Sequence, residues 1–440
     1  MILQNWWYTT LIESKAKKSE PLRGKLSCDV LIIGGGMAGL HAALYLADHG
    51  KEVVLLEKNI CGGSSTGKSA GFLTPDSELE LSQIIRRYGS ADAKQVWEIP
   101  SQGVDLIADS ITKYHIPCDF IKQDSLFVGI GNSGKSAVHD EAAARKLLRF
   151  PFARYDKEKI RAINLGEGYT GGIQYGGTYG INPLLYCQGL KDVLLKKGVK
   201  IFESTEVASI KDATAKTHLG EVKAKHIILC IDKINKNFTF AEEKTYYAQT
   251  FLSISEPLDN DDITNIFPQK NVMCWDSTLV YSYYRLTGDK RLLLGGGSAL
   301  TTFLPADVTS PRIIQGVINN FKKRFPPLKH VEFIQYWPGR IDTTKDLIPI
   351  VDFDPTDSRV QYVLGCVGLP WAAFCGYYAA RRLLDKSFCH RYCTYLALNR
   401  KYFVPLWMQH FFGKGLAFSL NVSYSKYIQK EKNIGTPYFH

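Results

Sequence analysis

The chain has 440 residues, of which 45% are hydrophobic and 22% charged. This composition is typical of folded globular proteins and excludes a mainly disordered or fibrous one. At about 100 to 200 residues a domain, the length predicts two or three domains. The longest apolar runs are far shorter than the roughly 20 residues of a membrane-spanning helix, so the sequence predicts no membrane span.

Fifty-four Lys and Arg against 43 Asp and Glu give a net charge of +11. The excess is spread over short clusters, so nucleic acid is not expected as a partner. The first residues lack the pattern of a secretory signal, and the ten cysteines include no Cys-x-x-Cys pair. Both observations favour a cytoplasmic protein. Cys389, His390 and Cys393 have no second ligand pair at zinc-site spacing, so no metal site is predicted.

The first elements along the chain carry a nucleotide-binding pattern. Residues 29–33 predict a buried strand, a helical pattern runs on to Gly50, and residues 53–56 predict a second strand. Between the first strand and the helix, Gly34, Gly36 and Gly39 form the pattern G-x-G-x-x-G. In this context the glycines allow a tight turn, the approach of a pyrophosphate and close packing of helix on strand. The segment therefore predicts a parallel βαβ unit that binds a dinucleotide, with Met37 and Ala38 also in contact with it.

Glu57 ends the second predicted strand, where its carboxylate can accept a hydrogen bond from a ribose hydroxyl. Glu57 and the following Lys58 are therefore predicted to bind the cofactor. This motif alone does not separate a flavin from a nicotinamide dinucleotide. No second complete motif is present, because neither Gly295-Gly296-Gly297 nor Gly176-Gly177 has the required context. We therefore expect one tightly held cofactor that the substrate itself reduces.

The later elements predict a second kind of architecture. Residues 78–113 are mostly helical in pattern, residues 182–197 predict an amphipathic helix, and strands are expected between 199 and 231. Alternating aromatic and β-branched residues from 245 to 297 predict an antiparallel sheet. We therefore predict a two-domain α/β (α+β) fold. It has a Rossmann-like dinucleotide-binding domain (20–80, 166–244 and 326–385), a substrate domain built on an antiparallel sheet (81–165 and 245–325), and a C-terminal helical extension (386–440).

Several segments between residues 5 and 385 together resemble one superfamily. They are Asn5-Trp6-Trp7, the glycine motif, residues 63–71, residues 180–183, the sheet from Trp275 to Gly297, residues 337–340 with Asp346 and Pro349, and residues 365–370. The chain resembles the FAD-dependent oxidoreductases of the D-amino-acid oxidase superfamily, nearest the branch of glycine and sarcosine oxidases, D-amino-acid dehydrogenases and γ-glutamylputrescine oxidase. The resemblance implies FAD as cofactor. It also implies oxidation of a small-molecule amine or amino acid, with hydride transfer to flavin N5 and hydrolysis of the imine.

The resemblance also implies which residues contact FAD. The diphosphate and one side of the flavin would be lined by Ser64, Ser65, Lys68, Ser69, Ala70 and Gly71, and the adenine would meet the backbone of Val207. Gly365, Gly368, Leu369 and Pro370 lie at the start of a helix, whose amides would stabilise negative charge on the reduced flavin. Gly339 aligns with a cysteine that holds the flavin covalently in some members. Since no cysteine is near it in the sequence, we predict non-covalent FAD.

Other positions depart from the superfamily pattern and leave the electron acceptor open. Leu293 aligns with an oxygen-activating lysine, and Ala372 with a lysine beside flavin N1 in some members. Lys68 is the candidate to replace the first of these lysines. An oxidase and a dehydrogenase therefore both remain open, with O2, a quinone or a carrier protein as acceptor.

The substrate side is expected to have an aromatic wall, for which the candidates are Trp275, Tyr281, Tyr283, Tyr284 and Trp371, although core packing explains each equally well. Arg285 and Arg340 could bind a substrate carboxylate through paired hydrogen bonds, or they could form structural ion pairs. The predicted catalytic residues are Lys68, Tyr284, Arg285, Arg340 and Trp371.

Two rival functions and two interpretations of the tail remain open. The chain could be the flavin domain of a tRNA-modifying oxidoreductase or a flavin-binding protein without catalysis. The tail mixes basic residues with aromatic and apolar ones, namely Tyr402, Phe403, Leu406, Trp407, Met408, Phe411, Phe412, Leu416 and Phe418. It could lie peripherally on a membrane and meet a quinone, or it could cap the substrate domain or form a dimer contact.

Overall fold

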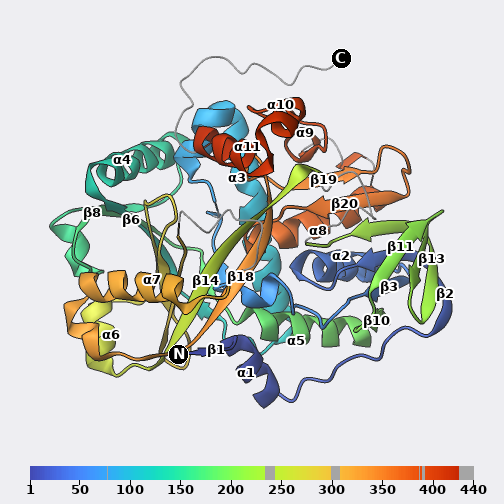
Figure 1. Ribbon diagram of the computed structural model, residues 1–440, viewed down its shortest axis with the longest axis horizontal. Helices are drawn as coiled ribbons and strands as arrows, with labels where there is room; N and C mark the ends of the chain where they lie inside the picture. Colours follow the sequence, from blue (N-terminus) through green and yellow to red (C-terminus); the bar gives the residue numbers. More distant parts are fainter. Residues whose placement is uncertain (77, 233–242, 299–307, 386, 389–391, 426–440) are drawn as a thin grey trace.

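The structure is a computed structural model that describes residues 1–76, 78–232, 243–298, 308–385, 387–388 and 392–425. Figure 1 shows two bodies side by side. One, on the right, contains β2 (Gly24–Ile33), and the other, on the left, contains β6 (Asp124–Ile130) and β8 (Tyr169–Tyr175). The long strands β14 (Thr245–Pro257) and β18 (Phe333–Thr344) run through the centre between the two bodies.

The first body is built on a mostly parallel sheet. Its order in the described residues is β10 (Lys200–Phe202), β3 (Val53–Leu56), β2, β13 (Gly220–Leu229), β12 (Thr214–Thr217) and β11 (Val207–Lys211); β20 (Val360–Leu364) pairs with β13, and β19 (Ile350–Phe353) with β20. Strands β10, β3, β2, β13 and β20 are parallel, so their carboxyl ends share one edge. With α2 (Met37–Asp48) between β2 and β3, the predicted βαβ unit is confirmed.

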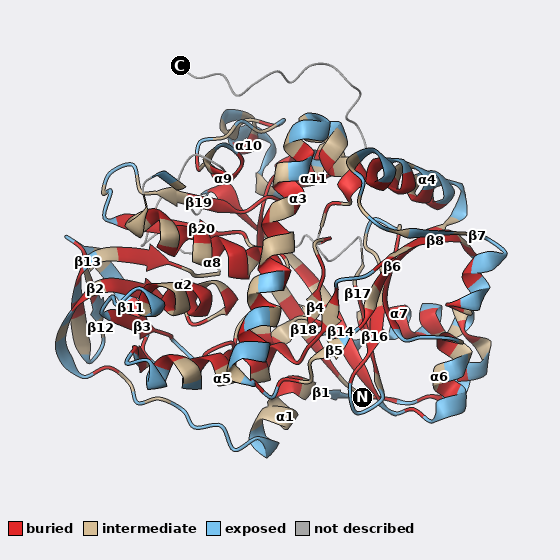
Figure 2. Cartoon of the chain, turned by 180° about the vertical axis from the view of Figure 1, so that it is seen from behind, coloured by how far each residue is buried: buried red, intermediate tan, exposed pale blue. Residues whose placement is uncertain are grey.

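Four helices pack on this sheet or on one another beside it: α2, α3 (Leu81–Tyr114), α5 (Pro183–Lys196) and α8 (Leu369–Leu384). Their contact is close, since a Cβ on Gly376 of α8 would lie 1.9 Å from the carbonyl oxygen of Ala38. Helix α5 begins where the sequence predicts, because the Asn182 side chain accepts hydrogen bonds from Leu184 and Leu185, with Pro183 in the first turn. Figure 2 shows α2 and α8 largely buried.

The second body is built on a mixed sheet. Among the described strands its order is β1 (Ile2–Leu3), β18, β14, β17 (Arg291–Gly296), β16 (Tyr283–Leu286), β15 (Val272–Asp276), β6, β8 and β7 (Ala153–Asp156). The pairs from β18 to β16 are antiparallel, and those of β14, β17 and β16 confirm the antiparallel sheet predicted for residues 245–297. Around the sheet lie α4 (Gly131–Leu148), α6 (Asn260–Ile266) and α7 (Pro311–Arg324). The strands β4 (Phe72–Leu73), β9 (Tyr179–Gly180) and β5 (Ile121–Lys122) form a separate small sheet, and helix α1 (Trp6–Glu13) packs on α5.

The expected domain boundaries differ from the sheets at two strands. β8 and β18 fall in ranges expected to belong to the dinucleotide-binding domain, yet both pair within the mixed sheet. The physical reason is that a strand's pattern shows how its faces are buried, but not which sheet supplies its partners.

The chain ends, as far as it is described, in three helices above both bodies: α9 (Cys393–Leu396), α10 (Leu406–Phe412) and α11 (Lys414–Ser423). Arg400 joins this segment to the core through two hydrogen bonds to Asp346, of 2.7 and 2.8 Å. Lys345, which is fully buried, donates to the carbonyl of Val404 at 3.3 Å. No helix in the described ranges is long and apolar enough to cross a membrane.

Candidate active site

The glycine motif forms one wall of a cleft at the carboxyl edge of the parallel strands. Gly34 has a φ of +106°, and a Cβ there would lie 2.2 Å from the carbonyl oxygen of Cys230, so only glycine fits. A Cβ on Gly39 would lie 1.9 Å from the carbonyl oxygen of Gly34. Helix α2 therefore begins directly against the end of β2, and its first turn faces the cleft, where the Met37 amide donates to Thr66 Oγ1 at 3.2 Å.

Glu57 is held in place at the end of β3. Its two carboxylate oxygens accept hydrogen bonds from the amides of Gly35 and Asn59, each at 2.8 Å. Burial raises the pKa of Glu57, and the two N–H donors oppose the rise. Each oxygen keeps a lone pair for a ligand hydroxyl, and Glu57 lines the cleft beside Lys58.

The cleft encloses about 1160 Å³ between protein atoms, part of it open to solvent. Ten of the predicted cofactor residues line it: Gly34, Gly36, Met37, Ala38, Glu57, Lys58, Ser64, Ser65, Val207 and Gly365. A Cβ on Gly36 would lie 3.3 Å from Thr66 Oγ1, in the space that a pyrophosphate needs. Glycines without side chains, a helix start and a held carboxylate together fit a dinucleotide such as FAD.

The remaining predicted cofactor residues lie outside the cleft lining, namely Gly39, Lys68, Ser69, Ala70, Gly71, Gly339, Gly368, Leu369 and Pro370. Gly39 packs helix on strand, and Leu369 is buried in the core. Lys68 and Gly339 do lie together, because a Cβ on Gly339 would be 3.5 Å from the carbonyl oxygen of Lys68.

Sequence reasoning missed several lining residues, among them Gly62, Gly63, Thr66, Thr205, Glu206, Cys230, Ile231, Asp232, Ile341, Asp342, Val363 and Cys366. Asp232 accepts hydrogen bonds from the hydroxyls of Ser64, at 2.9 Å, and Ser65. Asp232 could have been predicted as a cleft residue from its position just after β13, because the parallel strands β2 and β13 end at the same edge of the sheet.

A second cavity adjoins the cleft, and Ile341 lines both. The second cavity measures about 560 Å³, open solvent included, and its wall is Glu78, Ala248, Thr250, Leu279, Val280, Tyr281, Tyr283, Ile341, Thr343, Leu347, Val367, Phe418 and Val422. Most of this wall is apolar or aromatic. Among these lining residues Glu78 alone carries a charge, and Tyr281 donates a hydrogen bond of 3.0 Å to it.

The predicted catalytic residues Lys68, Tyr284, Arg285, Arg340 and Trp371 do not line the second cavity. Tyr284 points into the opposite core, where its hydroxyl meets Asn164 and Tyr169. Trp371 is buried among the helices around the parallel sheet. Of the expected aromatic wall, Tyr281 and Tyr283 line the cavity, whereas Trp275 donates to Glu80 at 2.9 Å.

Neither arginine is placed to receive a substrate carboxylate in the second cavity. Arg285 is fully buried and donates to the carbonyl oxygens of Ala70 and Ile181, at 2.8 and 2.6 Å. On β18, Ile341 and Thr343 line the cavity, so Arg340 points to the other strand face, where it lies over the ring of Tyr247. The expectation for Arg285 is corrected, because its donors are used on backbone carbonyls.

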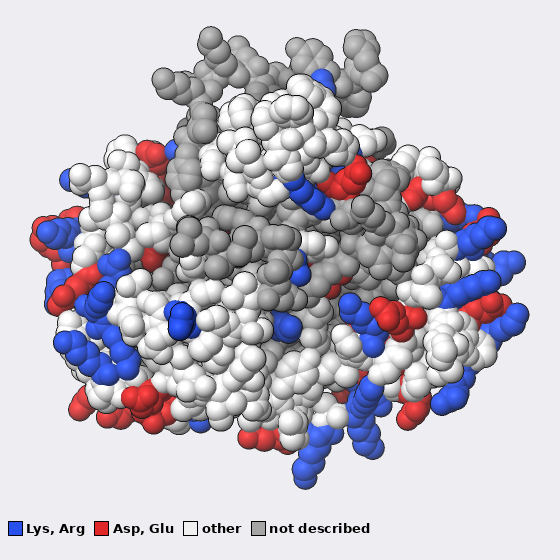
Figure 3. All heavy atoms as spheres, viewed as in Figure 1, with Lys and Arg blue, Asp and Glu red and all other residues white. Residues whose placement is uncertain are grey.

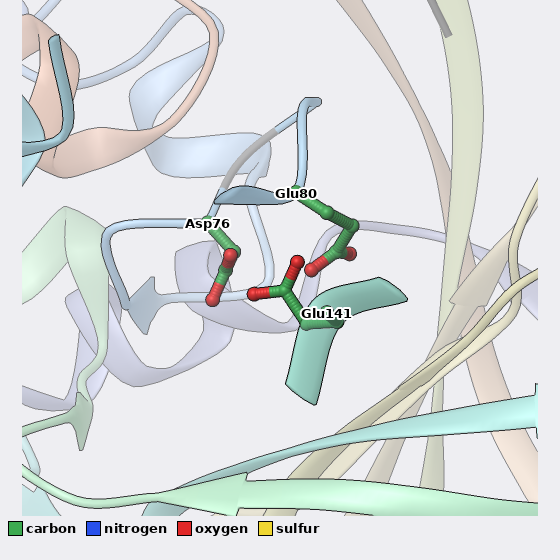
Figure 4. A group of neighbouring side chains, drawn as sticks. All are labelled: Asp76, Glu80 and Glu141. Carbon is green, nitrogen blue, oxygen red and sulfur yellow. The ribbon is translucent and has the colours of Figure 1, made fainter. Parts of the chain in front are cut away.

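A buried group of carboxylates lies near the second cavity (Figure 4). Asp76, in the segment before α3, and Glu80, which caps the start of α3, face Glu141 of α4, and one oxygen from each lies within 4.8 Å of the others. Arg145 donates to Glu141 at 2.9 Å and to Asp76 at 3.3 Å. Burial, and then the Glu141 charge, raise the pKa of Glu80 to about 7, and burial also raises the pKa of Asp76. The negative charge of the three carboxyl groups is therefore offset partly by bound protons and partly by the Arg145 guanidinium. The other metal candidates, Cys389 and His390, lie outside the described residues.

A dinucleotide cleft on a parallel sheet, beside an apolar cavity on an antiparallel one, defines a two-domain nucleotide-binding enzyme fold. The family of FAD-dependent oxidoreductases (DAO) matches residues 29–382, and the chain belongs to this family. Its cofactor is FAD.

Individual proteins are similar over most of their length. The γ-glutamylputrescine oxidoreductase of Escherichia coli (strain K12) is 28% identical over 374 residues, which cover 82% of this chain and 84% of that protein. The glycine oxidase of Bacillus subtilis (strain 168) is 24% identical over 355 residues, 77% of this chain and 87% of that one. The crystal structure of glycine oxidase from Geobacillus kaustophilus matches the fold with a TM-score of 0.73 at 16% identity, over 86% of this chain and 99% of that one.

Proposed function

We propose that the chain oxidises the C–N bond of an amine. The observation that carries this proposal is the meeting of the FAD cleft and the apolar cavity at Ile341. Bound FAD supplies an acceptor for two electrons and a proton, taken as hydride at N5. A neutral amine that loses the hydride from its carbon would become an iminium ion and then lose an N–H proton to give the imine. Water would hydrolyse the imine to a carbonyl compound and ammonia or a smaller amine. Two relatives support this reaction class, because one is named as an oxidoreductase of an amine and the other as an oxidase of an amino acid.

The cavity wall suggests what kind of amine is preferred. Its apolar and aromatic side chains suit an alkyl chain, and the Glu78 carboxylate attracts a positive group. No Lys or Arg stands among the described lining residues to pair with a substrate carboxylate. We therefore propose alkyl amines and diamines, rather than amino acids, as the preferred substrates. The chain's part in the reaction is to bind and orient the amine and to exclude water.

The test is anaerobic bleaching of the flavin by a panel of alkyl amines, diamines, amino acids and N-methyl amino acids. Diamines should bleach it at the lowest concentrations. Glu78→Gln should raise the concentration needed for half-reduction by diamines about tenfold, the equivalent of one charged hydrogen bond. Glu13→Gln, which removes an exposed carboxylate on α1, is the matched control and should change nothing.

Three outcomes would contradict parts of the proposal. Bleaching by amino acids alone would refute the substrate preference and keep the reaction class. No bleaching by any compound would refute the reaction class and favour a flavin-binding protein without catalysis. Tight, salt-sensitive tRNA binding without bleaching would favour the tRNA-modifying alternative.

A further inference from the structure

An exposed apolar patch covers the outer side of the C-terminal helices. The side chains of Phe403, Trp407, Phe411, Phe412, Leu416 and Leu420 form this C-terminal patch, and Trp407 and Phe411 are 71% and 83% exposed. Eight other large apolar side chains are exposed in the described residues, and they are spread from Met1 to Leu279. In Figure 3 the surface over α10 and α11 is correspondingly almost free of charge. Such a concentration of exposed apolar side chains is typical of a docking site.

The C-terminal patch is formed mostly by helices α10 and α11, which pack on the rest of the protein through their inner side. On the inner side, the Phe418 ring stacks on Tyr246 at 4.9 Å, and the Tyr246 hydroxyl donates to Gln409. The Asn421 side chain accepts from the amide of Val404 at 3.0 Å. The outward side chains are therefore presented by helices whose other face is already packed.

Charge favours one occupant for this patch. Residues 386–440 contain eight Lys and Arg and a single acidic residue, Glu431, so this eighth of the chain carries more than half of its +11 net charge. Among the described residues of this segment, Lys401 is exposed and Lys414 is half-buried, so two copies docked through the patch would bring like charges together, which is repulsive. An anionic lipid surface offers the opposite charge and an apolar interior for Trp and Phe.

We propose that α10 and α11 dock this enzyme on an anionic membrane surface, with Trp407, Phe411 and Phe412 inserted at the headgroup level and neighbouring lysines such as Lys401 on the lipid charge. The helices span 7 and 10 residues, so they can lie in the interface but cannot cross it. Because Phe418 and Val422 of α11 line the second cavity, the docked surface lies next to the substrate site. This proposal does not depend on the substrate.

The test is sedimentation of the full-length holoenzyme with lipid vesicles. We expect binding to vesicles that contain about one third phosphatidylglycerol in phosphatidylcholine, weaker binding to pure phosphatidylcholine, and loss of binding at high salt. The double variant Trp407→Ser/Phe411→Ser should bind at least about tenfold more weakly. Ile12→Ser/Leu147→Ser, at side chains 76% and 61% exposed elsewhere, is the control and should bind like the wild type.

Size-exclusion chromatography of the same proteins separates lipid from protein partners. The proposal expects the wild type and the double variant to elute alike in the absence of lipid. A wild-type dimer that the double variant splits would overturn it in favour of self-association. Equal binding of both variants to vesicles, or no binding by the wild type, would overturn it as well. Flavin bleaching by amines in solution should be unchanged in the double variant, since neither side chain is among the described residues that line the cleft or the second cavity.

Discussion

At the scale of single residues, hydrogen bonds within the protein fix the groups that line the cofactor cleft. Glu57 is fixed by two backbone amides, and Ser64 and Ser65 are fixed by Asp232. Groups held in this way lose little freedom when a ligand arrives, so binding costs less entropy. The same cleft also contains two cysteines, Cys230 and Cys366, which bear on how FAD is attached.

We predict that FAD is held without a covalent bond. Burial raises the pKa of the Cys230 thiol and keeps it protonated, which makes it a poor nucleophile. Acid precipitation should therefore release all of the yellow chromophore, and the polypeptide mass should equal that of the sequence. Cys366→Ser serves as the control. Flavin that stays in the wild-type pellet but is released from Cys366→Ser would reveal a thioether at that residue.

Glu80 predicts a pH dependence of stability. Its pKa is raised from 4.5 to about 7 in the folded protein, so between these pH values the folded state binds more protons than the unfolded one. This contribution to stability is complete below pH 4.5 and is lost as the pH rises through 7. Glu80→Gln keeps an oxygen for the Trp275 N–H and cannot ionise.

Urea unfolding of both proteins from pH 5 to pH 8 measures this effect. Relative to Glu80→Gln, the wild type should lose about 2 kcal/mol of unfolding free energy over this range. Glu13→Gln should give a curve parallel to the wild type. If Glu80→Gln is parallel too, Glu80 does not titrate in this window.

At the scale of elements, register decides which side chains reach a site. The sequence predicted a strand around Tyr283, Tyr284 and Arg285, but alternation alone does not show which face meets the cavity. Pairing of Tyr283 with Gly295 and Tyr284 with Leu294 places Tyr283 on the cavity side and Tyr284 in the opposite core. The glycine motif was predictable because its chemistry is local, whereas the substrate wall depends on partners far along the chain.

Helix α11 forms part of the wall of the second cavity. From the sequence, the tail that contains it could either cap the substrate domain or contact a membrane. Phe418 is buried, lines the second cavity and belongs to the segment beyond residue 382, where the family match ends. We predict that Phe418→Ala widens the range of amines towards bulkier ones and lowers stability by about 3 kcal/mol. Phe321→Ala, in the core beneath the mixed sheet, should cost a similar amount and leave the substrate range unchanged. Flavin bleaching by linear and branched amines compares the two variants, and identical ranges would exclude Phe418 from substrate selection.

At the scale of the whole molecule, β14 and β18 of the mixed sheet run between the two bodies, and Ile341 of β18 lines both the cofactor cleft and the second cavity. The α/β class and the FAD family were predictable from the glycine motif and the spaced segments. The sequence did not predict to which sheet β8 and β18 belong, because strand pairing between segments far apart in the chain leaves no local signal.

The surroundings of Leu293 predict a slow reaction of the reduced enzyme with O2. Leu293 is buried among Trp7, Leu252 and Trp337, at the position that aligns with the oxygen-activating lysine of related oxidases. Leucine supplies no positive charge, and Lys68, the candidate to replace the lysine, does not line the second cavity, so reoxidation in air-saturated buffer should be on the order of a hundredfold slower than in an enzyme with the lysine. Stopped-flow mixing of reduced enzyme with O2 or with a soluble quinone measures both rates. Faster reoxidation by O2 than by the quinone would identify an oxidase.

The late position of α11 in the chain has a consequence for biosynthesis. The ribosome completes the parallel sheet with β20, which ends at Leu364, well before it adds Phe418 and Val422. A nascent or truncated chain that stops near residue 400 can therefore contain every strand of the FAD sheet while the substrate cavity lacks one wall. Premature termination in this stretch would yield a yellow protein without its normal selectivity, and colour alone would not reveal the loss.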